Sequence, residues 1–242
     1  MNLHVPTERL PVLVVTGLAR ETKLAAGPGL DAVTSGGNSQ RLRHVLAQRT
    51  VPGCSAVISF GIAGGLDPSL VAGDVVIATG VIGDGKRWPT HPELAASLAA
   101  SLSEGGVSAT LADFAGVDAP LLDPAAKAAV HHATGAAVAD MESHVACEFA
   151  ARHGLMFAGL RIVCDPAESS MPAMVAKALK PDGGVDHYAV LTDLLRKPRQ
   201  IGALTRLAGE ARTSFLALGR CRDLLGIERG IPKLVELLGD VA

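Results

Sequence analysis

The hydrophobic residues of the chain gather in segments of two kinds. Four apolar runs of strand length end at glycines or at an acid, as buried strands do where they enter a loop. Ala- and Leu-rich stretches of helical length occur around these runs. The predicted strands lie within residues 10–21, 55–66, 73–82 and 155–165, and the predicted helices are residues 39–48, 91–102, 123–133 and 140–154.

Strands that alternate with helices predict an α/β fold, a three-layer sandwich with a central mixed, largely parallel sheet flanked by helices. We expect a single domain over residues 1–242, because no linker or internal repeat interrupts the pattern before about residue 168. Basic C-terminal helices at about residues 188–242, broken near Lys197-Pro198, complete the prediction.

Glycines gather where the binding sites of such sheets lie, beyond the carboxyl ends of the strands. Gly17, Gly61 to Gly65 and Asp165 fall there. The glycine cluster lacks the G-x-G-x-x-G spacing of a dinucleotide site, and Asp67-Pro68 prevents a helix from following it directly. A tight turn explains the cluster, although neighbouring glycines also let backbone N–H groups approach a ligand. Taken alone, Asp165 would be a loop aspartate in an Asx-turn.

The composition excludes several classes of protein. With 48% hydrophobic and 19% charged residues, the chain of 242 residues is globular rather than disordered. Its net charge of −2 gives no reason to expect nucleic acid as a partner. The four cysteines form no C-x-x-C pair, so we expect a reduced, cytoplasmic protein with buried thiols and no metal site. No signal peptide or apolar stretch of roughly 18 residues is evident, which favours a soluble protein.

One glutamate occupies a position that helical periodicity makes apolar. Glu142 shares its helical face with Ala146, Phe149 and Ala150. A carboxylate on that face loses its hydration unless something binds it, which suggests a ligand. The alternative is structural, because Asp140 can cap the helix and Glu142 can favour its positive end.

Three stretches together resemble the superfamily of purine nucleoside phosphorylases and methylthioadenosine/S-adenosylhomocysteine nucleosidases. They read GIAGGLDPSLVAGDVVIA, ADMESHVACEFA and LRIVCDPAE, and they follow the family's order over roughly residues 10–170. The resemblance implies an enzyme that cleaves the N-glycosidic bond of a purine nucleoside without a cofactor. It implies that Met141 packs beside the ribose, that Glu142 accepts hydrogen bonds from ribose hydroxyls and that Asp165 protonates N7 of the departing purine. The base-binding residues that it implies are Ala63, Gly64, Asp140 and Cys164.

These roles agree with the chemistry of the reaction. Breaking the ribosyl C–N bond builds positive charge on the sugar and negative charge on the base. A positioned general acid contributes roughly 10²–10⁴-fold by neutralising the base, and a carboxylate at the sugar stabilises the oxocarbenium-like centre. Asp165 must hold its proton near neutral pH, so we expect its pocket to raise its pKa.

The resemblance leaves the acceptor of the ribosyl group open. In the loop after the first strand, the family's phosphorylases hold phosphate with an arginine and its nucleosidases orient water with a glutamate. The stretch GLARET offers both, as Arg20 and the candidate catalytic residue Glu21. Ser59 and Ile62 stand at phosphate-binding positions and lack the charge for it, which favours water slightly and keeps phosphate as a candidate co-substrate. The phosphate or water site would also include Gly17, Ser35, Gly36 and Gly61.

Within the superfamily, the details look most like the hopanoid-associated phosphorylases, to which release of adenine from adenosylhopane is attributed. The stretches TSGGNSQRL, GDGKRWPTHPEL and PLLDPAAKAAV carry this likeness. A lipid at the 5′ end needs an apolar exit, for which Met171, Met174, Val175 and Leu179 have suitable spacing, unless they form a surface helix packed on its own domain. Two other functions are open, a methylthioadenosine/S-adenosylhomocysteine-type nucleosidase and a non-catalytic nucleoside-binding protein.

The C-terminal part of the chain is basic. Between Leu191 and Arg222 seven Lys or Arg accompany two acids. Such a stretch can contact the inner face of an anionic membrane, or it can form a solvated helical hairpin. The resemblance further implies a homo-oligomer, so the expected partners are a purine nucleoside with or without a lipid, a second copy of the chain and a membrane surface.

Overall fold

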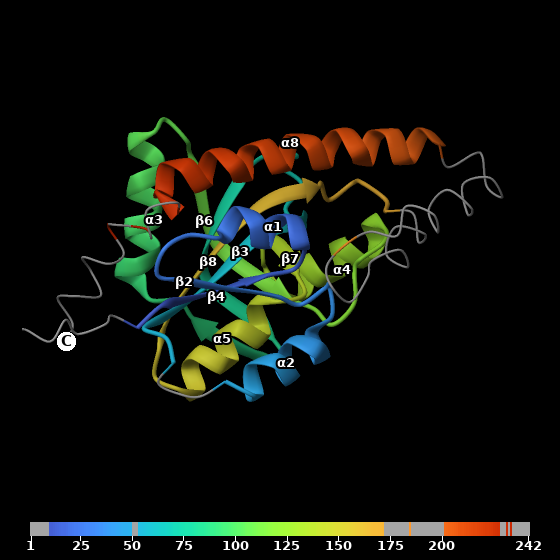
Figure 1. Ribbon diagram of the computed structural model, residues 1–242. Coiled ribbons are helices and arrows are strands. Elements are labelled where there is room, and N and C mark those ends of the chain that lie inside the picture. Colours follow the sequence, from blue (N-terminus) through green and yellow to red (C-terminus); the bar gives the residue numbers. More distant parts are fainter. Residues whose placement is uncertain are drawn as a thin grey trace, which may run out of the picture.

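A computed structural model describes residues 10–49, 53–171, 184, 201–227, 231 and 233. Within these residues a curved sheet lies between two layers of helices (Figure 1). The strands are β1 (Val12–Thr16), β2 (Leu30–Thr34), β3 (Ala56–Gly65), β4 (Val75–Gly83), β5 (Lys86–Pro89), β6 (Ala109–Gly116), β7 (Val138–Asp140) and β8 (Met156–Asp165).

The strand pairings make the sheet mixed and mainly parallel. Among the described strands, β1–β2, β1–β3, β3–β8, β4–β6 and β6–β7 are parallel pairs. The pairs β3–β7, β4–β5 and β4–β8 are antiparallel. The predicted fold class is therefore confirmed. In addition, β3, β8, β4, β6 and β7 pair in a closed circuit, which the sequence did not reveal.

Helices cover both faces of the sheet, as Figure 1 shows. On one face lie α1 (Ala19–Ala25), α3 (Pro92–Glu104) and α8 (Ile201–Leu225), and on the other lie α2 (Ser39–Ala47) and α5 (Ser143–Arg152). The remaining described helix, α4 (Pro124–Thr134), lies at the end of the sheet where β8 finishes.

Alternation along the strands divides the core between the two faces. In β1, Val12 and Val14 join the cluster under α1, α3 and α8, whereas Leu13 and Val15 join the cluster under α2 and α5. Successive side chains of a strand point to opposite faces, so a strand that is apolar throughout must be buried on both. This is why β1 reads as one continuous apolar run.

The carboxyl ends of β1, β3 and β8 meet at one edge of the sheet, since these strands run parallel. The chain leaves β1 at Gly17, as the sequence predicted. It then enters α1 at Ala19, whereas the sequence predicted a loop there. The acid Glu21 consequently lies in the first turn of a helix.

Four described strands, β2, β5, β6 and β7, escaped the sequence prediction. At the C-terminus, residues 201–225 form one helix, and the predicted break near Lys197-Pro198 lies outside the described residues. The single-domain assignment for residues 1–242 stays a prediction.

Candidate active site

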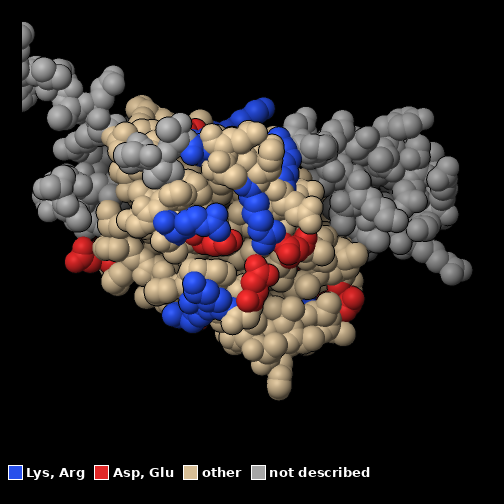
Figure 2. Space-filling view, turned by 90° about the horizontal axis from the view of Figure 1, so that it is seen from below, with Lys and Arg blue, Asp and Glu red and all other residues tan. Residues whose placement is uncertain are grey.

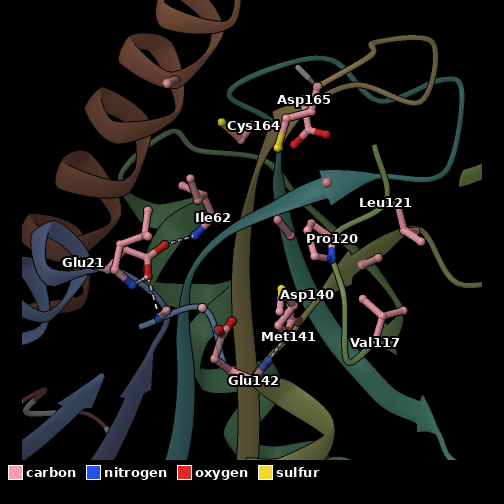
Figure 3. A pocket seen from close by; sticks show the side chains of 18 of the residues that line it. Glu21, Ile62, Val117, Pro120, Leu121, Asp140, Met141, Glu142, Cys164 and Asp165 are labelled. Carbon is pink, nitrogen blue, oxygen red and sulfur yellow. Dashed lines mark hydrogen bonds between the residues drawn. The ribbon is translucent and has the colours of Figure 1, made fainter. Parts of the chain in front are cut away.

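A cavity of about 510 Å³ opens at this edge of the sheet. Figure 3 shows Glu21, Glu142 and Asp165 at separate corners of it, with Pro120 and Leu121 facing Glu21 from the opposite wall. Most of the lining is apolar or backbone. The charged lining residues are Glu21, Arg41, Lys127, Asp140, Glu142 and Asp165.

Glu21 fills a small anion-binding nest made by backbone amides. Its Oε2 accepts hydrogen bonds from the N–H groups of Gly17 and Leu18, both at 2.7 Å, and its Oε1 accepts one from Ile62 at 2.8 Å. Burial raises the pKa of Glu21, while Arg161 and these three N–H groups oppose the rise. A carboxylate has about four acceptor sites, so one remains on Oε1, where the side chain borders the cavity.

Glu142 is the N-cap residue of α5, and its carboxylate reaches across to the chain segments after β1 and β2. Its Oε1 accepts a 2.6 Å hydrogen bond from Ser35 Oγ. A Cβ atom at Gly17 would lie 3.0 Å from this oxygen, so glycine allows the close approach. Burial raises the pKa of Glu142 to about 7, with Arg161 opposing the rise and Asp140 reinforcing it.

Arg161 connects the acids of the site, although the sequence gave it no role. It lies in the middle of β8 and is fully buried. Its Nη2 lies 2.7 Å from Ser59 Oγ, 3.2 Å from Asp140 Oδ1 and 3.3 Å from Glu142 Oε2. Burial acts to lower the pKa of Arg161, but the surrounding carboxylates raise it above its ordinary value. The available signal was an arginine inside an apolar strand run, since a buried charge requires partners.

One guanidinium thus faces three buried carboxylates, those of Glu21, Asp140 and Glu142. When all three are ionised, the cluster carries an excess of negative charge. Electrostatic interactions are strong where water is excluded. The cluster can therefore stabilise positive charge that develops on a bound sugar.

Asp140 closes the N-terminus of α5. Its Oδ1 accepts hydrogen bonds from the N–H groups of Glu142 and Ser143, at 2.8 and 2.6 Å, and its Oδ2 accepts one from Ser143 Oγ at 2.6 Å. These bonds satisfy amides at the helix start that have no partner within the helix. The capping role considered in the sequence is present, while contact of Asp140 with the base stays a prediction.

Asp165 ends β8 and forms a buried ion pair with Lys127 of α4, with 2.7 Å between Oδ2 and Nζ. Burial raises the pKa of Asp165, as the sequence argument anticipated, and Lys127 opposes the rise. The sequence gave no role to Lys127. It lies among alanines in a helical stretch, where a lysine ordinarily faces solvent.

Some of the other expected site residues line the cavity, and others do not. Gly17, Gly36, Ala63, Gly64, Met141 and Cys164 line it. Among the described lining residues Arg20, Ser35 and Gly61 are absent. The Arg20 guanidinium lies over the ring of Phe215, 4.1 Å from its centroid. Gly61 lies behind the wall, where an added Cβ would meet Glu21 and Arg161 at 2.6 Å. Their roles at a phosphate or water site stay predictions.

Another wall of the cavity is apolar and comes largely from the C-terminal part of the chain. Met171, Leu207, Ala211 and Phe215 line it. Of the wall expected from the sequence, Met171 is therefore in place. The other three residues, Met174, Val175 and Leu179, lie outside the described residues.

The described residues hold no group of three or more His, Cys, Asp or Glu that could bind a metal ion. No described helix combines the length and apolar character needed to cross a membrane. All four cysteines, Cys54, Cys147, Cys164 and Cys221, are free and buried.

A model of the family described as the phosphorylase superfamily matches residues 11–180. No curated protein matches the chain. Solved structures match over most of their length. One is a 5′-methylthioadenosine/S-adenosylhomocysteine nucleosidase of Helicobacter pylori with butyl-thio-DADMe-Immucillin-A, at 14% identity and a TM-score of 0.62, covering 89% of this chain and 99% of that one.

Two further structures have the same fold. The futalosine hydrolase of Helicobacter pylori strain 26695 is 13% identical, with a TM-score of 0.62 and coverage of 88% of this chain and 97% of that one. A nucleosidase of Colwellia psychrerythraea 34H in complex with adenine is 16% identical, with a TM-score of 0.60 and coverage of 78% and 96%. At these identities the likeness extends to the fold alone.

Proposed function

The chain belongs to the phosphorylase superfamily, and from this premise we propose that it releases the purine base of a nucleoside by transferring the ribosyl group to water. Membership makes it an enzyme of the nucleoside phosphorylase and nucleosidase type, which cleaves the N-glycosidic bond. Water as the acceptor and the identity of the nucleoside are our proposals.

The observation that carries hydrolysis is the place of the Glu21 carboxylate. Three backbone N–H groups, those of Gly17, Leu18 and Ile62, already bind it. Such converging amides are what a phosphate would need. A phosphate would instead meet an occupied nest and a like charge. The arginine that favoured phosphate in the sequence, Arg20, is stacked on Phe215.

In the proposed reaction Asp165 gives a proton to N7 of the purine. The C1′–N9 bond breaks as this proton arrives, and its electron pair passes to the base. Glu142 accepts hydrogen bonds from the ribose hydroxyls, and the carboxylate cluster around Arg161 stabilises the cationic sugar. Water held at the remaining acceptor site of Glu21 attacks C1′ and gives its proton to Glu21. The products are the free base and a sugar with a hydroxyl group at C1′.

We propose adenosylhopane, an adenine nucleoside with a lipid at its 5′ end, as the substrate. The cavity of about 510 Å³ has a size suited to a nucleoside. The apolar wall of Met171, Leu207, Ala211 and Phe215 suits the start of a hydrocarbon substituent. The likeness of the sequence to the hopanoid-associated phosphorylases supports the same substrate. The products would then be adenine and ribosylhopane.

A second candidate is 5′-methylthioadenosine or S-adenosylhomocysteine. The fold shared with a 5′-methylthioadenosine/S-adenosylhomocysteine nucleosidase favours it. A series of adenosines with lengthening 5′-alkyl groups separates the two. The adenosylhopane proposal expects kcat/KM to rise with chain length, whereas a small closed site would reject the longer members.

We further propose a homo-oligomer in the cytoplasm, at or near the inner membrane face. Three described basic residues of α8 have polar partners within the protein, since Arg206 pairs with Glu210, Arg220 donates to the Gly105 carbonyl and Arg222 pairs with Asp223. A fourth, Arg212, is exposed and supports membrane contact. The face that carries α2 and α5 has basic and acidic side chains interspersed (Figure 2). Sedimentation with anionic vesicles tests this part of the proposal, and a chain that stays in the supernatant would contradict it.

The acceptor is tested by following adenine release from a 5′-alkyl adenosine with and without phosphate. We expect equal rates, and a sugar product without phosphorus by mass spectrometry. A ribosyl 1-phosphate formed in phosphate buffer would overturn hydrolysis. Asp165→Asn is the control, because loss of the acid should lower kcat by about 10²–10⁴-fold and leave KM within a few-fold.

A further inference from the structure

We propose that Lys127 is a positioning residue for the general acid. Its ammonium holds Oδ2 of Asp165, so that the proton to be transferred resides on Oδ1 and the carboxylate formed by transfer is already paired. This inference rests on the proposed function, in which Asp165 protonates the departing base.

The surroundings of Lys127 are unusual for a lysine. The side chain is 1% exposed, and the residue lines the cavity. Four oxygens surround Nζ and share its three N–H groups. They are Asp165 Oδ2 at 2.7 Å and the backbone carbonyls of Asp165 at 3.0 Å, Pro166 at 2.8 Å and Ser169 at 3.1 Å. An ammonium group is fully satisfied by this cage, which fixes the direction from which it meets the carboxyl group.

The ion pair determines which oxygen of Asp165 carries the proton. The positive ammonium repels a proton on the oxygen that it contacts, so a proton taken up by the carboxyl group favours the other oxygen. When Oδ1 then donates this proton to N7, the negative charge formed on Asp165 is neutralised by Lys127 at 2.7 Å. The cation thus makes the buried carboxyl group a stronger acid without exposing it to water.

Other charged groups act on the pair as well. Glu210 of α8 faces it and raises the pKa of Asp165, against the effect of Lys127. Ser169 Oγ donates to Glu210 Oε1 at 3.1 Å, which holds that acid beside the turn. Cys164, the neighbour of Asp165 on β8, stays a neutral thiol because burial raises its pKa to about 12. Among the described residues Lys127 is the cation in contact with the acid.

Lys127 also joins α4 to the turn after β8 through its three carbonyl contacts, so a loss of activity alone would not separate the two roles. A purely structural lysine would lower activity at every pH by the same factor. A lysine that acts through Asp165 must shift the titration of that group. The pH profile therefore separates the two.

The experiment compares wild type, Lys127→Met and Lys127→Arg, with Lys23→Met as the matched control at an exposed lysine of α1. In Lys127→Met we expect the alkaline limb of the kcat profile to move up by at least about one pH unit, because the cation that favours ionised Asp165 is gone. We expect kcat at the optimum to fall by about tenfold or more as the acid weakens. Lys127→Arg should keep the limb near its wild-type position, and Lys23→Met should change nothing.

The same variants in the Asp165→Asn background complete a double-mutant cycle. If Lys127 acts through Asp165, Lys127→Met should cost little further activity once the acid is absent. If the two substitutions lower the rate by independent factors that multiply, the proposal is overturned. The same holds if the alkaline limb of a folded Lys127→Met protein stays within about 0.3 pH units of wild type.

A third measurement separates this inference from the proposed function. The carboxyl carbon of Asp165 can be titrated by NMR in protein labelled at aspartate, with Asp165→Asn to assign the signal. The pKa of Asp165 should be higher in Lys127→Met than in wild type, whether or not any nucleoside is cleaved. A wild type that releases no base would overturn the proposed function, whereas an unchanged titration would overturn the role of Lys127.

Discussion

A carboxylate removed from water must find donors, and the two glutamates of the cavity find them differently. Glu21 is bound by backbone amides that the fold fixes in place. Glu142 relies on two side chains, Ser35 and Arg161, and it also feels the negative charge of Asp140. Its ionised form is therefore poorly compensated until a sugar supplies hydroxyl donors. This difference leads to separate predictions for the two residues.

Replacing Glu142 by Gln should raise the stability of the unliganded protein in a pH-dependent way. The folded-state pKa is about 7, above the ordinary 4.5, so the folded state holds a proton that the unfolded state has lost. The unfolding free energy of wild type should thus decrease as pH rises between these values, whereas Gln does not titrate. We expect the stability of Glu142→Gln relative to wild type to increase by on the order of 1–3 kcal/mol from pH 5 to pH 8.

Chemical denaturation at several pH values measures this difference, and Glu148→Gln on the half-exposed side of the same helix is its control. Activity should fall in Glu142→Gln although stability rises. A stability difference that does not change with pH would contradict the prediction.

Glu21→Gln should lower both stability and rate. Whichever way the amide is oriented, its NH₂ group meets backbone N–H groups that now donate to a carboxylate oxygen. We expect a loss of about 1–3 kcal/mol in unfolding free energy and of about 10²-fold or more in the rate of base release. Thermal melts and initial rates check this, with Glu93→Gln, an exposed acid in the first turn of α3, as control. A stable variant with a wild-type rate would remove Glu21 from the mechanism.

At the scale of elements, the sequence predicted the strands that are apolar throughout and failed where strands are short or half-exposed. β7 has three residues, and β5 reads KRWP at a sheet edge. β6 carries the exposed Leu111 and an aspartate, so its hydrophobic residues follow neither the two-residue period of a strand nor a continuous apolar run. These strands form because they pair with segments distant in the sequence, and such pairing cannot be read from the local propensity of their residues. Glu142 could be singled out because it lies on an apolar helical face, whereas Asp165 was assigned a role through the family resemblance and its place at a strand end. Arg161 lies inside an apolar strand run, a signal that the sequence prediction did not use. Lys127 gave no such signal, because it lies among alanines in a helix, where a lysine ordinarily faces solvent.

Strand β3 passes directly behind the site, and Gly61 of this strand leaves no room for a larger side chain. A Cβ atom there would lie 2.6 Å from Arg161 Nη1 and from the Glu21 carboxyl group. Gly61→Ala should therefore lower the unfolding free energy by about 1–3 kcal/mol and disturb the rate of base release as well. Gly209→Ala in α8 is the control, since nothing lies within 4 Å of its added carbon, and it should gain up to about 1 kcal/mol. A tolerated Gly61→Ala would contradict this packing.

At the scale of the whole molecule, the site joins distant parts of the chain. Its amide nest comes from the segment after β1 and from β3. Its acids come from α1, β7, the start of α5 and the end of β8, and its apolar wall comes largely from α8. Resemblance and the rule for strand ends predicted the glycines and the acids of this edge, but not the binding of the Glu21 carboxylate by backbone amides. The sequence did not place α8, because a helix that covers a cavity has the same amphipathic pattern as one that covers a sheet.

The wall contributed by α8 should set which 5′ substituents are accepted. Ala211→Leu adds three carbons to that wall and should lower kcat/KM for a long 5′-alkyl adenosine by about 10–200-fold relative to adenosine. Leu216→Ala, at a residue 64% exposed on the same helix, should leave the ratio unchanged. Competition between the two substrates in one reaction measures the ratio directly. An equal loss for both nucleosides would contradict a role in substrate selection.

The closed circuit of strands has a consequence for synthesis on the ribosome. β8 pairs with both β3 and β4, and its register joins Ala56 to Met156, so the ring stays open until this late segment has emerged. Contacts so distant in sequence form slowly. Meanwhile the apolar edges of β3 and β4 are open to pairing between nascent chains. A chain stopped at Gly154 should consequently be digested at protease concentrations that leave the chain of 242 residues intact. Translation through β8 is thus the step that commits the polypeptide to its native form.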